Sequence, residues 1–358
     1  MVFRFQTKIV KCFVVFLSIL FIYLIFENSN IIPRQPELKT EQIIIKARKR
    51  NSLRLSNLEN VCKRYNLGRY WVSSKPTVFK EPPAPQYEIF FYDLKHKLSW
   101  CPIYKAGTST WLYNLALLGG SSETQIANSK KQINDVVRDI LPSLESDDAK
   151  RALEHSLKFL IVRHPFERIL SAYRDKLENV AVRGIDGTHH FYQSFGSKIV
   201  AKYRTGGNNT NSRLILKPGQ YIWNEEKEPI GVEPTFREFV KHLIDTDLRT
   251  RADDHWIPYY LFCTPCMVKY DIVGQLETMM EDQLFVIHEA NLQDKIKPRW
   301  RHKTNPFSND RVTGVSDLAK VYFSQLSQSD VSKLFEKYRL DFELFGYDEK
   351  PYYKYASS

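Results

Sequence analysis

Two separate stretches of this sequence place basic and hydroxyl side chains in a pattern that suits the binding of anions such as phosphate. The first stretch is a loop of small and hydroxyl residues that Lys105 opens, and it continues with Ala106, Gly107, Thr108, Ser109, Thr110 and Trp111. Consecutive backbone N–H groups in such a loop form a nest for phosphate, and the lysine adds positive charge. The second stretch runs from Arg163 to Lys176 and supplies further donors, namely Arg163, Arg168, Ser171 and Arg174. Together the two stretches predict a site that grips an anionic ligand at two points.

Each of these stretches joins an apolar run of strand length to a helical pattern. Residues 98–104 precede the Lys105 loop, and residues 156–162 precede Arg163. Behind Pro165 the apolar residues Ile169, Leu170 and Tyr173 recur at helical spacing. In an open α/β sheet, ligands bind beyond the carboxyl ends of strands, where helix N-termini favour anions. The sequence therefore predicts an α/β fold with a parallel central sheet and flanking helices.

The Lys105 loop does not have the order of a Walker A nucleotide-binding motif. In that motif the lysine follows the second glycine, and a Ser or Thr after it holds magnesium. Here Lys105 comes first, and no such magnesium-binding arrangement follows it. A kinase-like phosphotransferase stays an alternative, but the absence of the Walker A order counts against it.

Two further residues are candidates for moving a proton. His255 is the first choice, because histidine titrates near neutral pH and the carboxylates of Asp253 and Asp254 stand next to it. Glu277, after a predicted strand that begins at Tyr270, is the second. The alternative readings are that His255 only makes a core hydrogen bond and that Glu277 fixes a turn. The pair His189 and His190 lacks metal-ligand partners at suitable spacing and predicts a solvated loop.

Composition limits the class of protein. The chain has 358 residues, of which 43% are hydrophobic and 13% aromatic, so it has enough apolar side chains for a substantial core and is not a disordered protein. Its net charge of +11 favours an anionic partner. Nucleic acid, a membrane surface, a nucleotide and an acidic polysaccharide all fit that charge.

The N-terminal region has the layout of a membrane anchor. Basic residues precede an uncharged run of 15 residues from Cys12 to Phe26, and no small-residue cleavage site follows it. We predict a cytoplasmic tail over residues 1–8, a signal anchor over residues 9–26, a stem over residues 27–86, and a lumenal domain over residues 87–350. The basic cluster at residues 46–50 is interpreted as part of the stem.

A lumenal domain would be exposed to oxidising conditions and to glycosylation. Cys62, Cys101, Cys263 and Cys266 form an even set with three alternative disulfide pairings. Asn208 begins an Asn-Asn-Thr glycosylation sequon.

Taken together, these motifs resemble those of the Golgi carbohydrate sulfotransferases, in particular the group of chondroitin 4-O-, dermatan 4-O-, HNK-1 and GalNAc-4-O-sulfotransferases. The Lys105–Trp111 loop is similar to their 5′-phosphosulfate loop, and residues 163–176 are similar to their 3′-phosphate element. Further similarity lies at residues 255–258, 263–266, 270–278 and 338–347, so that the resemblance spans residues 87–348.

The resemblance implies a P-loop-like sulfotransferase domain in the Golgi membrane, with single-pass type II topology. The sulfate donor would be 3′-phosphoadenosine 5′-phosphosulfate, with no metal and no nucleic-acid partner. The acceptor would be a glycosaminoglycan or glycoprotein glycan, with the 4-position of GalNAc in chondroitin as the expected target. Lys105 and its loop would hold the reactive end of the donor, and Arg163 and Ser171 the 3′-phosphate. Arg168 and Arg174 are second candidates, and the alternative for both is a structural role or a surface salt bridge.

Two rival functions and the oligomeric state stay open. The rivals are the kinase-like phosphotransferase and a membrane-tethered glycan-binding protein that has lost catalysis. A homodimer is compatible with the sequence.

Overall fold

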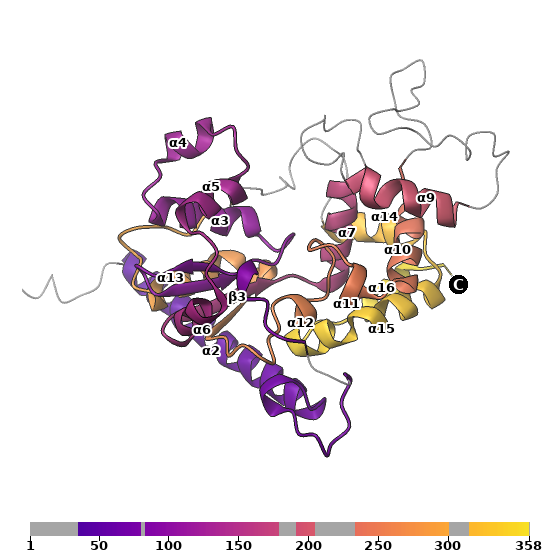
Figure 1. The fold of residues 1–358 in the computed structure, drawn as a ribbon, viewed down its shortest axis with the longest axis horizontal. Coiled ribbons are helices and arrows are strands. Elements are labelled where there is room, and N and C mark those ends of the chain that lie inside the picture. The colour runs from indigo at the N-terminus through magenta and orange to yellow at the C-terminus, as the bar shows by residue number, and fades with distance from the viewer. Residues whose placement is uncertain (1–34, 80–82, 179–190, 205–232, 301–314, 358) are drawn as a thin grey trace, which may run out of the picture. The chain divides into compact units, whose positions relative to one another are not determined.

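A mixed four-stranded sheet lies at the centre of the computed structural model, which describes residues 35–79, 83–178, 191–204, 233–300 and 315–357 (Figure 1). The strands are β1 (Phe91–Asp93), β2 (Leu98–Cys101), β3 (Leu157–Val162) and β4 (Ile272–Gln275), and they lie side by side in that order. β2, β3 and β4 are parallel, whereas β1 runs antiparallel to β2 at the edge. The predicted α/β class and parallel central sheet are therefore confirmed.

Helices flank this sheet and are joined by short 3₁₀ segments at Gly68–Tyr70, Tyr87–Ile89 and Leu276–Thr278 and by a π-helical segment at Tyr192–Gly196. The α-helices that the structure describes are α2 (Gln35–Arg64), α3 (Thr108–Leu118), α4 (Glu123–Asn128), α5 (Ile133–Ile140), α6 (Ser146–Glu154), α7 (Pro165–Lys176), α9 (Ser197–Tyr203), α10 (Phe236–Asp245), α11 (Leu248–Arg251), α12 (Tyr259–Phe262), α13 (Met279–Glu289), α14 (Val315–Phe323), α15 (Gln328–Phe345) and α16 (Lys350–Tyr355).

Aromatic residues fill the core on the α3 side of the sheet. Trp100 of β2 and Phe159 of β3 stack with ring centroids 6.1 Å apart, and Trp111 of α3 lies 4.5 Å from Phe159. A second cluster packs α7, α10, α14, α15 and α16 together, and Figure 1 shows these helices gathered on the opposite side from α3, α4 and α5. α7 belongs to this second cluster and directly follows β3, so it links the sheet to the helical layer.

The parallel register brings three strand ends to one edge of the sheet. Cys101 at the end of β2 pairs with Leu160, and Val162 at the end of β3 pairs with Gln275 at the end of β4. The segments that follow these strands carry Lys105, Arg163 and Glu277, respectively. Residues separated by 58 to 172 positions in sequence are thereby collected at one place, where α/β proteins bind ligands.

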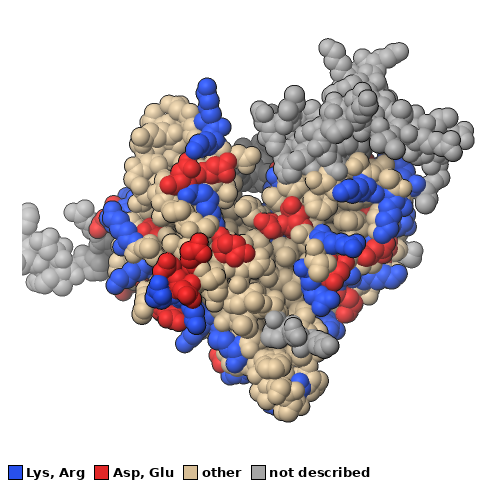
Figure 2. Space-filling view, in the orientation of Figure 1, with Lys and Arg blue, Asp and Glu red and all other residues tan. Residues whose placement is uncertain are grey.

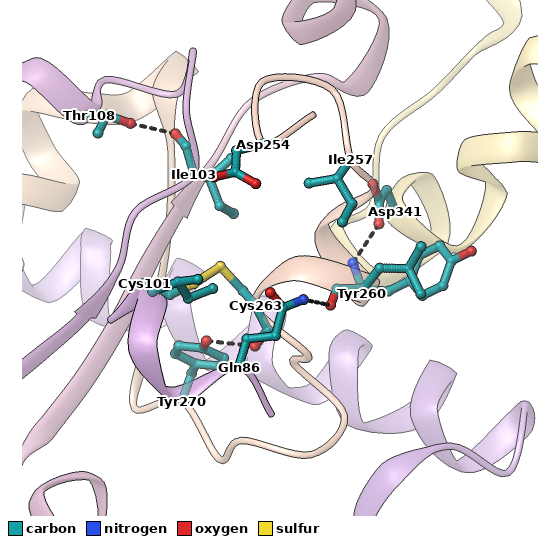
Figure 3. The surroundings of a disulfide bond; sticks show 12 residues. Gln86, Cys101, Ile103, Thr108, Asp254, Ile257, Tyr260, Cys263, Tyr270 and Asp341 are labelled. Atoms are coloured by element: carbon teal, nitrogen blue, oxygen red, sulfur yellow. Dashed lines mark hydrogen bonds between the residues drawn. A yellow bond between two sulfur atoms is a disulfide. The ribbon is translucent and has the colours of Figure 1, made fainter. Parts of the chain in front are cut away.

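Two disulfides brace this edge and the segments behind it. Cys101 pairs with Cys263, and Cys62 pairs with Cys266. The first bond ties the end of β2 to the residue that follows α12, and Figure 3 shows it between Ile103 and Tyr270. The phenol of Tyr270 donates a hydrogen bond of 2.8 Å to the carbonyl of Cys263. Of the three alternative pairings, the structure has the one that joins Cys62 to Cys266 and Cys101 to Cys263. Both disulfides connect residues that are far apart in sequence.

The predicted boundary between stem and domain at residue 87 stays a prediction, but part of the predicted stem contacts the sheet. One compact unit extends from Lys49 to Ser358, and the other comprises Met1–Arg48. Within the larger unit, Arg54 donates to the Val273 carbonyl at 3.0 Å and to the Asp282 carboxylate at 2.8 Å, so the second half of α2 packs against β4 and α13. Acidic partners of the basic side chains in this segment lie more than 200 residues away in sequence. For that reason the segment looked like a solvated stem when only the sequence was considered.

The predicted anchor at residues 9–26 and the Asn208 sequon lie outside the described residues. Over the residues that the structure does describe, no helix is both long and apolar enough to cross a membrane.

The buried contacts of Arg54 give a test of this boundary. Arg54→Met should lower the free energy of unfolding by about 3 kcal/mol, because it removes the hydrogen bonds of Arg54 to the nearly buried Asp282 carboxylate and to the Val273 carbonyl. Urea unfolding of the protein measures this change. Arg64→Met is the matched control, since Arg64 is 64% exposed in its ion pair with Glu343, and it should change stability little. Equal effects of the two variants would contradict the packing of α2 described above.

Candidate functional site

The Lys105 loop is a tight turn held by its own backbone. Lys105 has φ 69° and Gly107 has φ 85°, so both adopt the left-handed conformation. That conformation is uncommon for a lysine and must be stabilised by its surroundings. At Gly107 an added Cβ would lie 2.9 Å from the end of the flexible Met279 side chain, which can move aside, so the positive φ is what favours glycine at this position. The turn ends in α3, where the backbone N–H groups of Thr110 and Trp111 both donate to the Gly107 carbonyl, at 3.0 and 3.4 Å.

The residues of this loop divide into partly exposed and buried ones. Lys105, Gly107 and Ser109 are partly exposed, whereas Ala106, Thr108 and Thr110 are buried. The hydroxyl of Thr108 donates a 2.6 Å hydrogen bond to the Ile103 carbonyl, as Figure 3 shows, so its proton is already used within the turn. This differs from the predicted role of that hydroxyl as a donor to the ligand.

Trp111 has a structural position. Its side chain is fully buried against Trp100 and Phe159 in the sheet core. Trp111 was predicted as part of the ligand-binding loop, and in the structure its side chain anchors the first turn of α3 to the sheet. Its contribution to a binding site is therefore to hold the loop in place.

Arg163 joins the two predicted anion-binding stretches. Its guanidinium donates to the Lys105 carbonyl at 3.3 Å, and the same group lies 3.5 Å from the Glu167 carboxylate. Glu167 in turn accepts a 2.9 Å hydrogen bond from the phenol of Tyr352 in α16. The structure thus brings the two predicted anion-binding stretches into contact through Arg163 and Lys105.

One face of α7 runs between these two cations. Glu167, Ser171 and Asp175 are spaced four residues apart, so they lie on the same side of the helix. Glu167 pairs with Arg163, and Asp175 pairs with Lys105 at 3.1 Å. Ser171 is partly exposed and lies one helical turn from each carboxylate. This position is compatible with the predicted role of Ser171 beside Arg163, which stays a prediction.

Arg168 differs from its predicted role. Its side chain is 1% exposed and its guanidinium donates to three backbone carbonyls, those of Tyr104 at 3.0 Å, Asp254 at 2.8 Å and Ile257 at 2.5 Å. All of these groups belong to the protein. Arg168 therefore holds the residue before Lys105 and the residues on both sides of His255 to the same point, and it does not present its charge to a ligand.

His255 is oriented by Asp253. Its Nδ1 atom lies 2.6 Å from the Asp253 carboxylate, which also accepts the backbone N–H of His255 at 2.9 Å. Although burial alone would raise it, the pKa of Asp253 lies below its ordinary value because of these hydrogen bonds from His255. An ionised carboxylate at this distance places the proton of neutral His255 on Nδ1, so Nε2 has the free lone pair.

The surroundings of His255 keep its ring neutral. Burial lowers the pKa of His255, the Asp253 carboxylate partly offsets this effect, and the positive charges of Lys176 and Lys105 lower it further. The ring also packs against Tyr104, with the centroids 4.8 Å apart. A neutral imidazole next to the Lys105 loop is suited to accept a proton.

Glu277, the second candidate for the base, has a different position. Its two carboxylate oxygens accept hydrogen bonds from the backbone N–H of His164 and from the phenol of Tyr347, both at 2.9 Å. His164 is the N-cap residue of α7, so Glu277 fixes the start of that helix. These contacts favour a structural role for Glu277, at the start of α7 and not in the turn after β4 that the alternative reading named.

Within the described residues there is no group of three or more side chains that could hold a metal ion. His189 and His190 lie outside the described residues. Figure 2 shows basic and acidic side chains interspersed over the visible face, so the net positive charge is not gathered there in one patch.

Comparison with known proteins identifies the class. A model described as "Sulfotransferase family" matches residues 88–348, and the chain therefore belongs to the sulfotransferase family. The match covers every site residue discussed above except Tyr352, and it confirms the resemblance drawn from the motifs. No solved structure matches the chain.

Several curated relatives carry the name carbohydrate sulfotransferase. The chain is 27% identical to carbohydrate sulfotransferase 14 of Danio rerio over 255 residues, which are 71% of this chain and 60% of that protein. It is 30% identical to carbohydrate sulfotransferase 8 of Mus musculus over 267 residues, or 73% and 57% of the two lengths. For carbohydrate sulfotransferase 10 of Danio rerio the values are 28% over 308 residues, or 83% and 74%. The chain thus spans less than two thirds of the first two relatives.

Sequence reasoning missed two acidic residues of this site. Glu167 and Asp175 were given no role from the sequence, although their spacing of four from Ser171 places all three on one face. That spacing is the signal that would have found them.

The three hydrogen bonds of Arg168 lead to a first prediction for the site. Arg168→Lys should lower the free energy of unfolding by about 3 kcal/mol, since one ammonium group cannot reach three carbonyls in a fork. Thermal unfolding measures the loss. In contrast, Arg174→Lys should be nearly neutral, because Arg174 is 40% exposed in its pair with Glu178. A stable Arg168→Lys protein would contradict the tethering role.

A second prediction concerns the titration of His255. Asp253→Asn should lower the pKa of His255 still further, because burial and the two lysines then act without an opposing carboxylate. NMR titration of the histidine ring resonances follows this directly, with His288, which is partly exposed beside Glu289, as an internal reference. A rise in the pKa of His255 would show that Asp253 does not stabilise its charged form.

Proposed function

We propose that this protein is a carbohydrate sulfotransferase that moves a sulfuryl group from 3′-phosphoadenosine 5′-phosphosulfate to a sugar hydroxyl. The observation that carries the proposal is the contact between the two predicted anion-binding stretches at one edge of the parallel sheet, where Arg163 donates to the Lys105 carbonyl. Family membership and the names of the relatives support the same reaction class.

The donor has negative groups at two ends, which fits two separate cations on the protein. Lys105 and the N-terminal amides of α3 would bind the 5′-phosphosulfate, and Arg163 with Ser171 would bind the 3′-phosphate. A planar guanidinium suits such a charge-assisted contact. The α7 face formed by Glu167, Ser171 and Asp175 spans about 12 Å along the helix, so one ligand can reach both cations.

The reaction forms a bond between the acceptor oxygen and sulfur while the bond from sulfur to the 5′-phosphate oxygen breaks. His255 Nε2 would take the proton of the acceptor hydroxyl, and Lys105 would stabilise the negative charge that develops on the leaving phosphate. The protein otherwise positions the two reactants, as in phosphoryl transfer. In this scheme Asp253 fixes the tautomer of His255, and Arg168 keeps the His255 and Lys105 loops together.

The proposed acceptor is a glycosaminoglycan or glycoprotein glycan, with the 4-position of GalNAc in chondroitin as the specific target. The resemblance to the chondroitin and GalNAc-4-O-sulfotransferase group supports this choice. The proposed location is the Golgi membrane, with the enzyme anchored through residues 9–26 and its sulfotransferase domain in the lumen. The two long-range disulfides are compatible with an oxidising compartment.

A transfer assay tests this function against its rivals. The lumenal part of the protein is incubated with labelled phosphosulfate donor or labelled ATP and with a panel of desulfated glycosaminoglycans. The proposal expects label to move only from the sulfate donor, and most to desulfated chondroitin. Transfer from ATP alone would identify a kinase-like enzyme, and binding of glycans without any transfer would identify a binding protein.

Substitution of the two cations should separate their roles. Lys105→Ala should lower kcat by about 100-fold or more, because it removes charge stabilisation in the transition state. Arg163→Ala should chiefly raise the Kd for the product 3′-phosphoadenosine 5′-phosphate, by about 10- to 100-fold, which calorimetry measures.

Matched controls lie outside the site. Lys158→Ala removes a partly buried lysine that pairs with Asp271 at the start of β3, and Arg204→Ala removes an arginine that pairs with Glu238. Neither control should change Kd or kcat beyond about twofold. An unchanged Kd in Arg163→Ala would refute the assignment of the 3′-phosphate site.

A further inference from the structure

Other residues of the site contact both the backbone and the side chain of Lys105. Its carbonyl accepts a hydrogen bond from Arg163, and its ammonium group lies 3.1 Å from the carboxylate of Asp175. The backbone of Lys105 is itself in the left-handed conformation. The Asp175 contact therefore fixes the direction of a side chain whose backbone has an unusual geometry.

The charges around Lys105 are unequal. Asp175 on α7 is the carboxylate that contacts it, and the same Oδ2 atom lies 3.4 Å from the ammonium group of Lys176. Arg163 and Lys176 are the further cations that act on Lys105, and His255 lies near enough to be affected by the charge of Lys105. One carboxylate thus contacts two ammonium groups. Positive charge therefore exceeds negative charge among these groups, which favours the binding of a negatively charged ligand.

We propose that Asp175 is a positioning residue of the donor site, whose carboxylate holds the Lys105 ammonium group beside α7 until the phosphosulfate group of the donor binds there. This inference rests on the proposed function. It extends that function by assigning a role to a residue that neither of the two phosphate-binding motifs requires, since in those motifs the ligand contacts come from lysine, arginine, hydroxyl groups and backbone amides.

The protonation of Lys105 explains why such a residue is needed. Burial lowers the pKa of Lys105, and the Asp175 carboxylate opposes this effect, whereas Lys176 and Arg163 add to it. Among these contacts, the Asp175 carboxylate is the group that favours the charged form. Only the charged amine can stabilise the donor and the leaving phosphate, so the carboxylate favours the form that the reaction uses.

Competitive acetylation tests this inference without any need for activity. The full lumenal part is treated with trace acetic anhydride at pH 6 to 11, and mass spectrometry gives the labelled fraction of Lys105 at each pH. Only the neutral amine reacts. In Asp175→Asn the pH midpoint for labelling of Lys105 should fall, so that labelling below the midpoint rises about tenfold, which corresponds to one pKa unit.

Two controls make the result specific. Asp139→Asn removes the carboxylate of an exposed Lys131–Asp139 pair and should leave the Lys105 midpoint unchanged. Lys158 in the Asp175→Asn protein should label as in the wild type, which shows that the fold is intact. An unchanged midpoint for Lys105 overturns the proposal. A larger labelled fraction of Lys105 at high pH with an unchanged midpoint also overturns the proposal, because it would show only that the amine is more exposed.

The pH dependence of transfer gives a second readout. The alkaline limb of kcat/KM for the donor should move to lower pH in Asp175→Asn by the same amount as the labelling midpoint. An alkaline limb that stays in place while the midpoint falls would show that Asp175 does not act through Lys105 in the reaction. If the wild type transferred no sulfate, the proposed function would fail, and the labelling result would still decide whether Asp175 controls Lys105.

Discussion

The buried guanidinium of Arg168 is the interaction on which the site depends. It donates at the same time to the carbonyls of Tyr104, Asp254 and Ile257, which belong to the Lys105 loop and the His255 loop. A charge that is 1% exposed is stable only when such partners surround it. α7 carries this group, and the aromatic cluster of α10, α14, α15 and α16 supports α7. The distance between the candidate base and the donor loop is therefore set by the packing of a helix that follows β3.

Much of this arrangement could be predicted from sequence because it follows from local rules. An apolar run, a loop of small residues and a helix define each half of the site, and parallel strands bring such loops to one edge. Lys105 and Arg163 were found in this way, and their contact is seen in the structure. The burial of Arg168 could not be predicted, since no local pattern shows that a charged side chain is buried and hydrogen-bonded to carbonyls more than 60 residues away.

Other features depend on long-range contacts that the sequence does not display. Asp253 was placed beside His255 by its position in the chain, whereas Glu277 became a helix cap because β4 ends next to the start of α7. The second half of α2 appeared to be a stem until Arg54 was seen to pair with Asp282. Glu277 and Arg54 are therefore charged residues that join secondary-structure elements, although the sequence suggested a catalytic residue and a solvated one. The two carboxylates on α7, Glu167 and Asp175, show the converse, because they face the cations of the site.

A structure of the protein with bound 3′-phosphoadenosine 5′-phosphate would test the central claim most directly, which is that the Lys105 loop and Arg163 form one donor site. We expect electron density for the 5′-phosphate at Lys105 and the first amides of α3, and for the 3′-phosphate at Arg163 and Ser171. The Lys105–Asp175 contact should lengthen or be shared with the ligand. A nucleotide bound elsewhere, with Lys105 and Arg163 still paired only with Asp175 and Glu167, would contradict the account.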